Sequence, residues 1–226
     1  MNSYEIRSYE DIRDSLRVRL MDMKGNADTL ENAIYEPVGC GLALVAYMEM
    51  PDEIAAGGIA NVPKGLAERM PDTDPQTVLE DAMSGSVSAG HPKLCSIQDM
   101  LFGSVTGHDA ENYLFSGNTP EDPLLVLTTE DGRLGASALL YPGMQEQIGK
   151  IVGGDYYVLP SSVHEVLILP DNGEQTPSEL ARMVKEINEN EVSPQDRLCN
   201  RVLRFHADTQ ELTVAADPDR RREMER

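Results

Sequence analysis

The pattern of apolar residues is densest between residues 156 and 169, where two apolar runs flank a short polar segment. The runs are Tyr156–Leu159 and Val163–Leu169, and they are separated by Pro160, Ser161 and Ser162. Branched and aromatic residues favour strands, whereas proline and serine favour a turn because proline cannot donate a ladder hydrogen bond. The pattern predicts two strands joined by a tight turn, around which the rest of the fold is organised.

Two further hairpins are predicted from paired apolar runs. Leu124–Thr128 and Leu134–Leu140 flank the dipeptide Asp131-Gly132, which is typical of tight hairpin turns. A last hairpin is predicted from Arg201–Phe205 and Glu211–Ala215.

Two helices are predicted from capping signals that precede apolar residues at helical spacing. Thr176 and Glu179 form a capping box before one of them. Thr73 and Gln76 form a second capping box, and Asp74 is an alternative N-cap for the same helix.

The first 30 residues also show helical spacing. One apolar stripe runs through five positions, with charged residues between them: Tyr9, Ile12, Leu16, Leu20 and Met23. Apolar residues three and four positions apart lie on one side of a helix. The spacing predicts an N-terminal amphipathic helix within residues 1–30.

Hairpins with helices between them define the expected fold class. It is α+β, with a mixed, mostly antiparallel sheet built from hairpins and with helices packed on it. The N-terminal helix of residues 1–30 is expected to precede a single α+β domain over residues 31–216, with a polar loop at 103–123 as a candidate seam. Residues 217–226 are expected to form a flexible tail.

Composition adds a strong negative charge to this picture. The 226 residues include 39 acidic and 19 basic side chains, for a formal net charge of -20. Sequence-independent binding to nucleic acids requires Lys and Arg side chains that displace counterions, so direct nucleic-acid binding is not expected. The charge favours a soluble, monomeric protein. An acidic nucleic-acid mimic that inhibits a DNA-binding protein is an alternative interpretation.

The cysteines and the apolar runs indicate a cytoplasmic protein that does not enter a membrane. Cys40, Cys95 and Cys199 are scattered without a C-x-x-C pair, which favours reduced thiols. Residues 1–5 show neither the basic nor the apolar region of a signal peptide. The longest apolar run, Leu42–Met48, predicts a buried central strand and is far shorter than the roughly 20 residues of a membrane helix.

Candidate chemistry gathers at the turn of the central hairpin. Ser161, Ser162, His164 and Glu165 are residue types used in nucleophilic catalysis, and Tyr157 lies on the preceding strand. Adjacent strand residues point to opposite faces, so His164 and Glu165 are not expected to form a base with its orienting carboxylate. We therefore assign no catalytic residue and treat the five residues as a candidate binding or functional turn. A hydrolase that uses this turn is an alternative.

No metal site and no cofactor are expected from the sequence. The four histidines are scattered and do not form an H-E-x-x-H motif. The glycine-rich segments match neither G-x-G-x-x-G nor a phosphate-binding loop.

Three segments carry a resemblance to a known family. Leu134–Gly143, Asp155–Val166 and Met183–Asn188 resemble an uncharacterised domain-of-unknown-function family of gut anaerobic bacteria, with similarity over about residues 35–216. The family has no assigned activity, so the resemblance implies a bacterial fold unit, often encoded on mobile elements. The strong charge and the missing catalytic motifs predict a non-enzymatic cytoplasmic protein that binds another protein, and the resemblance implies an accessory role in a bacterial system.

Overall fold

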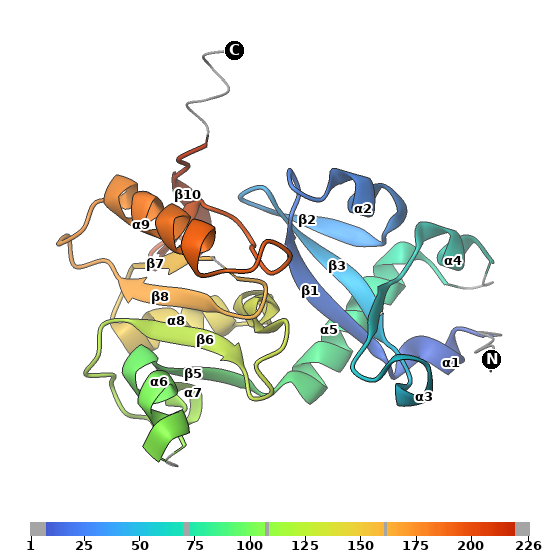
Figure 1. Cartoon of the computed structure of the whole chain (residues 1–226), viewed down its shortest axis with the longest axis horizontal. Coiled ribbons are helices and arrows are strands. Elements are labelled where there is room, and N and C mark those ends of the chain that lie inside the picture. The colour runs from blue at the N-terminus through green and yellow to red at the C-terminus, as the bar shows by residue number, and fades with distance from the viewer. Residues whose placement is uncertain (1–7, 70–72, 107–108, 161, 220–226) are drawn as a thin grey trace. The chain divides into compact units, whose positions relative to one another are not determined.

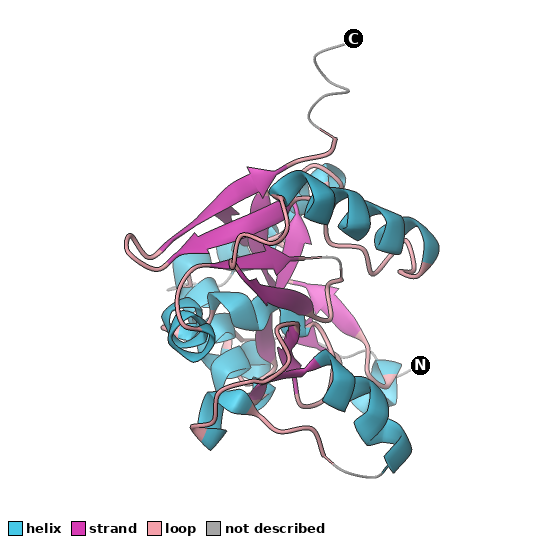
Figure 2. Ribbon diagram, turned by 90° about the vertical axis from the view of Figure 1, so that its left-hand side faces the viewer, coloured by secondary structure: helices cyan, strands magenta, loops and turns pink. Residues whose placement is uncertain are grey.

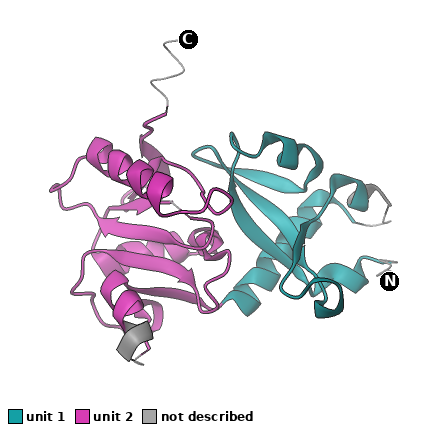
Figure 3. Ribbon diagram, viewed as in Figure 1, with its two compact units in different colours: residues 1–90 teal, residues 91–226 magenta. Residues whose placement is uncertain are grey.

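The computed structural model describes residues 8–69, 73–106, 109–160 and 162–219, and the chain forms two compact units, residues 1–90 and 91–226 (Figure 3). Each unit contains its own sheet with helices packed against it. Every strand pair in the described residues is antiparallel, so the predicted α+β class with antiparallel pairing is confirmed.

Unit 1 is built on a sheet whose central strand is β3, as the apolar run at residues 42–48 predicted. Its elements, in chain order (Figure 1), are α1 Glu10–Arg13, β1 Leu16–Asp22, α2 Ala27–Asn32, β2 Tyr35–Gly39, β3 Leu42–Glu49, α3 Asp52–Ala55, β4 Ile59–Asn61, α4 Lys64–Arg69 and α5 Pro75–Gly90. Strand β1 pairs with β3 along its whole length, while β2 and β4 pair with successive parts of β3.

Helix α5 begins and packs as its sequence signals indicate. The Asp74 carboxylate accepts a hydrogen bond of 2.9 Å from the Thr77 backbone N–H, so the alternative N-cap is the one used. The backbone N–H of Val18 on β1 donates to the Ser86 hydroxyl of α5 at 2.8 Å. This bond satisfies a backbone donor of β1, and it joins the helix to the strand.

The prediction of an amphipathic helix within residues 1–30 is wrong for residues 8–30, which the structure describes. Residues 10–13 form the short helix α1, and residues 16–22 form strand β1. Leu16, Val18 and Leu20 are all buried, and this period of two is that of a strand. Pairing with β3 overrode the helical spacing because the same apolar residues fit both periods.

Unit 2 is built on a sheet with the strand order β10-β9-β7-β8-β6-β5. Its elements are β5 Pro92–Ser96, α6 Ile97–Thr106, α7 Tyr113–Ser116, β6 Leu125–Thr129, the 3-10 helix η1 Gly135–Leu140, α8 Met144–Val152, β7 Tyr156–Leu159, β8 Val166–Pro170, α9 Pro177–Asn190, β9 Val202–His206 and β10 Glu211–Ala216. The predicted central hairpin is confirmed as β7 and β8, and the last hairpin as β9 and β10.

The hairpin predicted across Asp131-Gly132 is wrong in its second half. Strand β6 forms as expected, but residues 135–140 form η1 rather than a strand. Both edges of β6 are already occupied, by β5 on one side and β8 on the other. Gly135 packs so closely that an added Cβ would lie 2.6 Å from the Thr129 nitrogen and 2.7 Å from the His164 carbonyl oxygen. The run therefore packs against the sheet instead of joining it.

Helices cover both faces of the unit 2 sheet (Figure 2). On one face, Tyr157 and Leu159 of β7 pack against Leu180 and Val184 of α9. On the other, the ring of Tyr156 stacks on Phe205, and its hydroxyl donates to the Gln145 carbonyl oxygen of α8.

The predicted capping box of α9 is confirmed. The Thr176 hydroxyl accepts a hydrogen bond from the Glu179 backbone N–H, and the Glu179 carboxylate accepts one from the Thr176 backbone N–H.

The first residues of the expected flexible tail are held by unit 2. The Asp219 carboxylate accepts hydrogen bonds from Lys185 at 3.0 Å and from Asn200 at 2.9 Å. Residues 220–226, which make up the rest of that tail, lie outside the described residues.

Candidate functional site

The turn that joins β7 to β8 is hydrogen-bonded to the segment before β9. The Val163 backbone N–H donates to the Asp196 carbonyl oxygen at 2.8 Å, and Cys199 donates to the Pro160 carbonyl oxygen at 3.0 Å. Ser162 is buried, and its hydroxyl accepts a hydrogen bond from the backbone N–H of His164. The buried serine therefore shapes the turn.

Both ring nitrogens of His164 are engaged. The Leu134 backbone N–H donates to Nδ1 at 3.2 Å, so Nδ1 is the acceptor and the ring proton lies on Nε2. Nε2 lies 3.4 Å from the Asp196 carboxylate. The imidazole therefore links η1 to residue 196, and neither nitrogen faces the Ser162 hydroxyl as a base would.

The other residues of the candidate turn do not complete a catalytic group. Ser161 lies outside the described residues. Glu165 is partly buried and has no ion pair within the described part of the chain. Tyr157 is buried in β7, where the Arg204 guanidinium lies 5.9 Å from its ring centroid. The structure thus brings Ser162 and His164 together and places Tyr157 in a different cluster.

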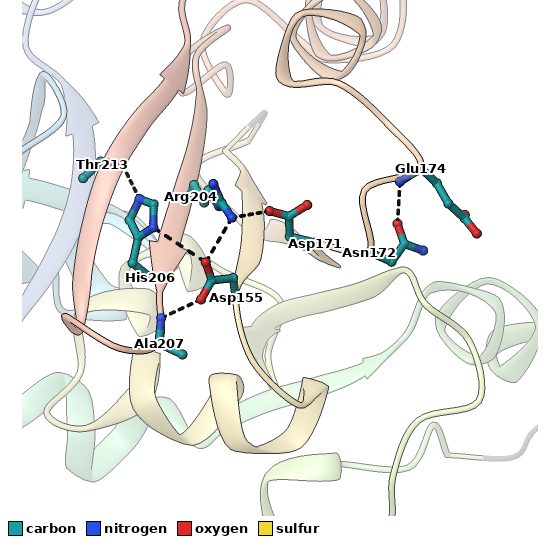
Figure 4. A network of polar contacts seen from close by, with 8 residues as sticks. All are labelled: Asp155, Asp171, Asn172, Glu174, Arg204, His206, Ala207 and Thr213. Atoms are coloured by element: carbon teal, nitrogen blue, oxygen red, sulfur yellow. Dashed lines mark hydrogen bonds and ion pairs between the residues drawn. The ribbon is translucent and has the colours of Figure 1, made fainter.

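That cluster is a polar network around Arg204, shown in Figure 4. The Arg204 guanidinium contacts the carboxylates of Asp155 at 3.0 Å and Asp171 at 2.6 Å. Asp155 precedes β7, Asp171 follows β8, and Arg204 lies on β9, so one cation ties three strands together. Burial, the Asp171 carboxylate and a hydrogen bond to it raise the pKa of Tyr157 against the opposing effect of Arg204.

The same network contains a hydroxyl, an imidazole and a carboxylate in series. His206 Nε2 lies 3.0 Å from the Thr213 hydroxyl, and its Nδ1 lies 3.6 Å from the Asp155 carboxylate (Figure 4). The second distance exceeds hydrogen-bond range. Asp155 is already occupied by Arg204 and by the Ala207 backbone N–H. The Thr213 hydroxyl is therefore not activated as a nucleophile. The network instead holds strands together, and it is here named a structural lock.

A third feature of unit 2 is a cleft with a volume of about 690 Å³, here named the acidic cleft. Its lining residues come from the start of α6 and from the segment that contains α7. Its lining includes Ser96, Asp99, Glu111, Tyr113, Glu121 and Asp122.

Hydrogen bonds fix both walls of the acidic cleft. The Ser96 hydroxyl donates to the Asp122 carboxylate at 2.8 Å and accepts from the Gln98 backbone N–H at the start of α6. The Asn118 amide donates to the Glu111 carboxylate at 2.6 Å. These bonds preorganise the lining on both sides of the cleft.

Asn112 anchors the α7 segment along β5, which is an edge strand. Its side-chain oxygen accepts from the backbone N–H groups of Leu94 and Leu114, and its nitrogen donates to the Pro92 carbonyl oxygen at 2.9 Å. The side chain thus caps α7 and satisfies backbone groups on the open edge of the sheet.

The charged side chains that line the acidic cleft are all negative. Four carboxylates line it, and its lining contains no Lys, Arg or His. Tyr113 is only 9% exposed, and burial together with Glu111, Asp99, Asp122 and Glu121 raises the pKa of its hydroxyl. The hydroxyl therefore stays protonated in a site that favours positive charge.

Exposed apolar side chains lie on the two helices that contribute residues to the acidic cleft. Met100, Leu101 and Phe102 lie on α6, and Phe115 lies on α7; these four residues are here named the apolar rim. Phe102 lies four positions after the cleft residue Gln98 and three after Asp99, so it lies on their side of α6. The cleft and the rim therefore come from the same two segments of unit 2, α6 and the segment that contains α7.

No motif in the sequence marks this surface, although one signal was present. Residues 94–132 contain seven acidic side chains and no Lys or Arg. The polar loop expected at 103–123 contains α7, and the rim residue Phe115 is separated in sequence from Met100, Leu101 and Phe102. The signal is a charge bias and not a motif. Only the fold shows that these acidic residues line a cleft.

The described residues contain neither a cluster of metal-ligand side chains nor a helix suited to span a membrane. No group of three or more His, Cys, Asp or Glu side chains in them is placed to hold a metal ion. No helix in that part of the chain has the length and apolar character needed to cross a membrane.

Fold and site together define an α+β protein of two units with an amphipathic acidic surface on the second unit. The chain belongs to the family of unknown function DUF5688, whose model matches residues 1–207. Searches of curated proteins and of solved structures found no match.

Proposed function

We propose that this chain is a non-enzymatic binding protein of the bacterial cytoplasm, and that it docks a basic segment of another protein on the apolar rim. The observation that carries the proposal is the exposure of the rim. Leu101, Phe102 and Phe115 are 63%, 64% and 74% exposed, and no other large apolar side chain among the described residues exceeds 43%. Clusters of exposed apolar side chains mark interaction surfaces.

The gain from covering this surface is substantial. Burying a Phe or Leu side chain that was exposed contributes about 1.5–3 kcal/mol. Aromatic side chains are also enriched in the central contacts of protein interfaces. Phe102 and Phe115 are therefore the expected anchors of the complex.

The charge around the rim supports a basic partner. The acidic cleft adjoins the rim, and residues 94–132 carry seven acidic side chains without Lys or Arg. Complementary charge steers association and excludes partners of like charge. An acidic or neutral apolar segment is therefore a poorer fit than a segment with Lys or Arg beside its apolar residues.

Two other interpretations have weaker support. A hydrolase at the central turn requires a base beside its nucleophile, whereas the His164 ring contacts Leu134 and Asp196. A nucleic-acid mimic requires carboxylates spaced along a surface like phosphates. The carboxylates of the acidic cleft instead surround one cavity.

The test is a binding measurement with a defined peptide on the full chain. A labelled helical peptide with Lys on one face and Leu on the other is titrated and followed by fluorescence anisotropy. We expect Phe102→Ser and Phe115→Ser each to weaken binding about tenfold, because each removes an anchor. The matched control is Val214→Ser, which removes an exposed apolar side chain from β10 of the same unit and should leave binding unchanged.

Two results would overturn the proposal. One is no binding of the peptide to the unsubstituted chain. The other is binding that Phe102→Ser and Phe115→Ser leave as tight as in the unsubstituted chain.

A further inference from the structure

We propose that the acidic cleft holds the cationic head group of a Lys or Arg side chain from the segment docked on the apolar rim. This inference rests on the proposed function, and it assigns the chemistry of a site beside the rim. Three independent observations carry it: the unpaired carboxylates of the cleft, the buried Tyr113 and the spread of the acidic groups.

The first observation concerns the carboxylates. Asp122 and Glu111 are held by hydrogen bonds from Ser96, Leu124 and Asn118. Asp99 and Glu121 have no side-chain hydrogen bond or ion pair within the part of the chain that the structure describes. Two carboxylates are thus fixed in place, and two are available to a ligand. Ionised carboxylates accept charge-assisted hydrogen bonds from ammonium and guanidinium groups.

The second observation is Tyr113, whose side chain is more than nine-tenths buried. Tyr113 lines the cleft, and its hydroxyl makes no hydrogen bond to any described residue and is not among the fully enclosed polar atoms. A tyrosine whose ring is buried usually has a hydrogen-bond partner for its hydroxyl, from the protein or from outside it. Here the open side is the acidic cleft, so the hydroxyl is available to accept an N–H from the ligand.

The third observation separates an organic cation from a metal ion. Hard metal ions require several oxygen ligands that converge to within about 2.0–2.6 Å of one point. The described residues offer no such group, although four carboxylates line the cleft. Carboxylates spread around about 690 Å³ fit a larger cation that donates several hydrogen bonds in different directions.

The rim explains why the cation belongs to a protein segment. Phe102 of the rim lies one helical turn after Gln98 and Asp99 of the cleft. A segment seated on the rim therefore places neighbouring side chains at the mouth of the cleft. A free polyamine shares the ammonium chemistry but has no apolar part to use the rim.

The test compares two peptides on the full chain by fluorescence anisotropy. One is the Lys and Leu helical peptide, and the other has every Lys replaced by Gln. We expect Asp99→Asn and Glu121→Gln each to weaken binding of the Lys peptide about tenfold, since each removes one charge-assisted hydrogen bond. Tyr113→Phe should weaken it several-fold, because the ring stays and only the hydroxyl is lost.

The Gln peptide supplies the control readout. Its weaker binding should be unchanged by Asp99→Asn, Glu121→Gln and Tyr113→Phe, and it should still depend on Phe102. The matched control variant is Asp28→Asn, which removes an exposed carboxylate from α2 in unit 1 and should not affect the Lys peptide.

The outcomes separate this inference from the proposed function. If neither peptide binds, the proposed function and the inference both fail. If both peptides bind equally well and depend on Phe102, docking on the rim stands, whereas the inference and the preference for a basic segment are overturned. If free spermine competes as well as the Lys peptide and is insensitive to Phe102→Ser, the cleft is a polyamine site, and the inference is again overturned.

Discussion

The Ser96 hydroxyl donates a hydrogen bond of 2.8 Å to the carboxylate of Asp122, 26 residues later in the chain. The same hydroxyl accepts backbone N–H groups at the start of α6. One buried side chain therefore caps the helix that carries most of the apolar rim and joins it to the opposite wall of the acidic cleft. The amphipathic surface depends on this bond for its shape.

Replacing Ser96 with Ala should destabilise unit 2. The substitution removes an N-cap and leaves the Asp122 carboxylate without its hydroxyl donor, and we expect a loss of about 1–2 kcal/mol. Urea unfolding followed by circular dichroism measures the loss. Ser178→Ala is the control, because Ser178 is exposed in the first turn of α9. An unchanged midpoint for Ser96→Ala would show that the bond does not hold the cleft together.

Gly135 should tolerate no side chain. An added Cβ would lie within 2.7 Å of backbone and side-chain atoms of β6 and of the His164 carbonyl oxygen. Gly135→Ala is therefore expected to cost about 2 kcal/mol or more through overpacking. Gly65→Ala is the matched control, since Gly65 lies in α4 with open space around it, and there alanine should be neutral or stabilising. Equal melting temperatures for the two variants would contradict the packing of η1.

Loss of Arg204 should leave two carboxylates facing each other. Arg204→Ala removes the cation between Asp155 and Asp171, and we expect a loss of about 1–2 kcal/mol. The expected cost is below that of a fully buried pair because 36% of the Arg204 side chain is exposed. Calorimetry of Arg204→Ala beside Arg182→Ala, an exposed arginine of α9, measures the difference. If the two variants melt alike, the network is not a structural lock.

The capping box of α9 should give a stability difference that depends on pH. Hydrogen bonds from Thr176 lower the pKa of Glu179, so the folded state favours its carboxylate form. Stability from a lowered carboxylate pKa is present above the ordinary pKa of glutamate, near 4.3, and is lost as pH falls through the lowered value. The gap between the unsubstituted chain and Thr176→Ala should therefore be wide at pH 7 and narrow toward pH 3, as measured by urea unfolding at each pH. A gap that widens on acidification would have the wrong sign.

Local signals predicted those parts of the fold whose partners are close in sequence. The hairpin of β7 and β8, that of β9 and β10 and the capped helix α9 each follow from turn or capping chemistry. The secondary structure of β1 and η1 could not be predicted in this way. It depends on which strand edge is free for pairing, and residues distant in sequence decide that.

The candidate site was less predictable than the fold for a related reason. Ser162 and His164 attracted attention as residue types, and the structure uses both to shape a turn. The acidic cleft is assembled from Asp99, Tyr113 and Glu121, which share no motif or fixed spacing. Their common feature is a stretch without basic residues, and a charge bias does not specify geometry.

The most direct test of the docking surface is a nuclear magnetic resonance titration of the ¹⁵N-labelled full chain with the Lys and Leu helical peptide. The account predicts that backbone amide shifts change in residues 97–102 and 111–122, the segments that carry the cleft and the rim. Changes confined to other parts of the chain, such as the Arg204 network, or no changes at all, would contradict it.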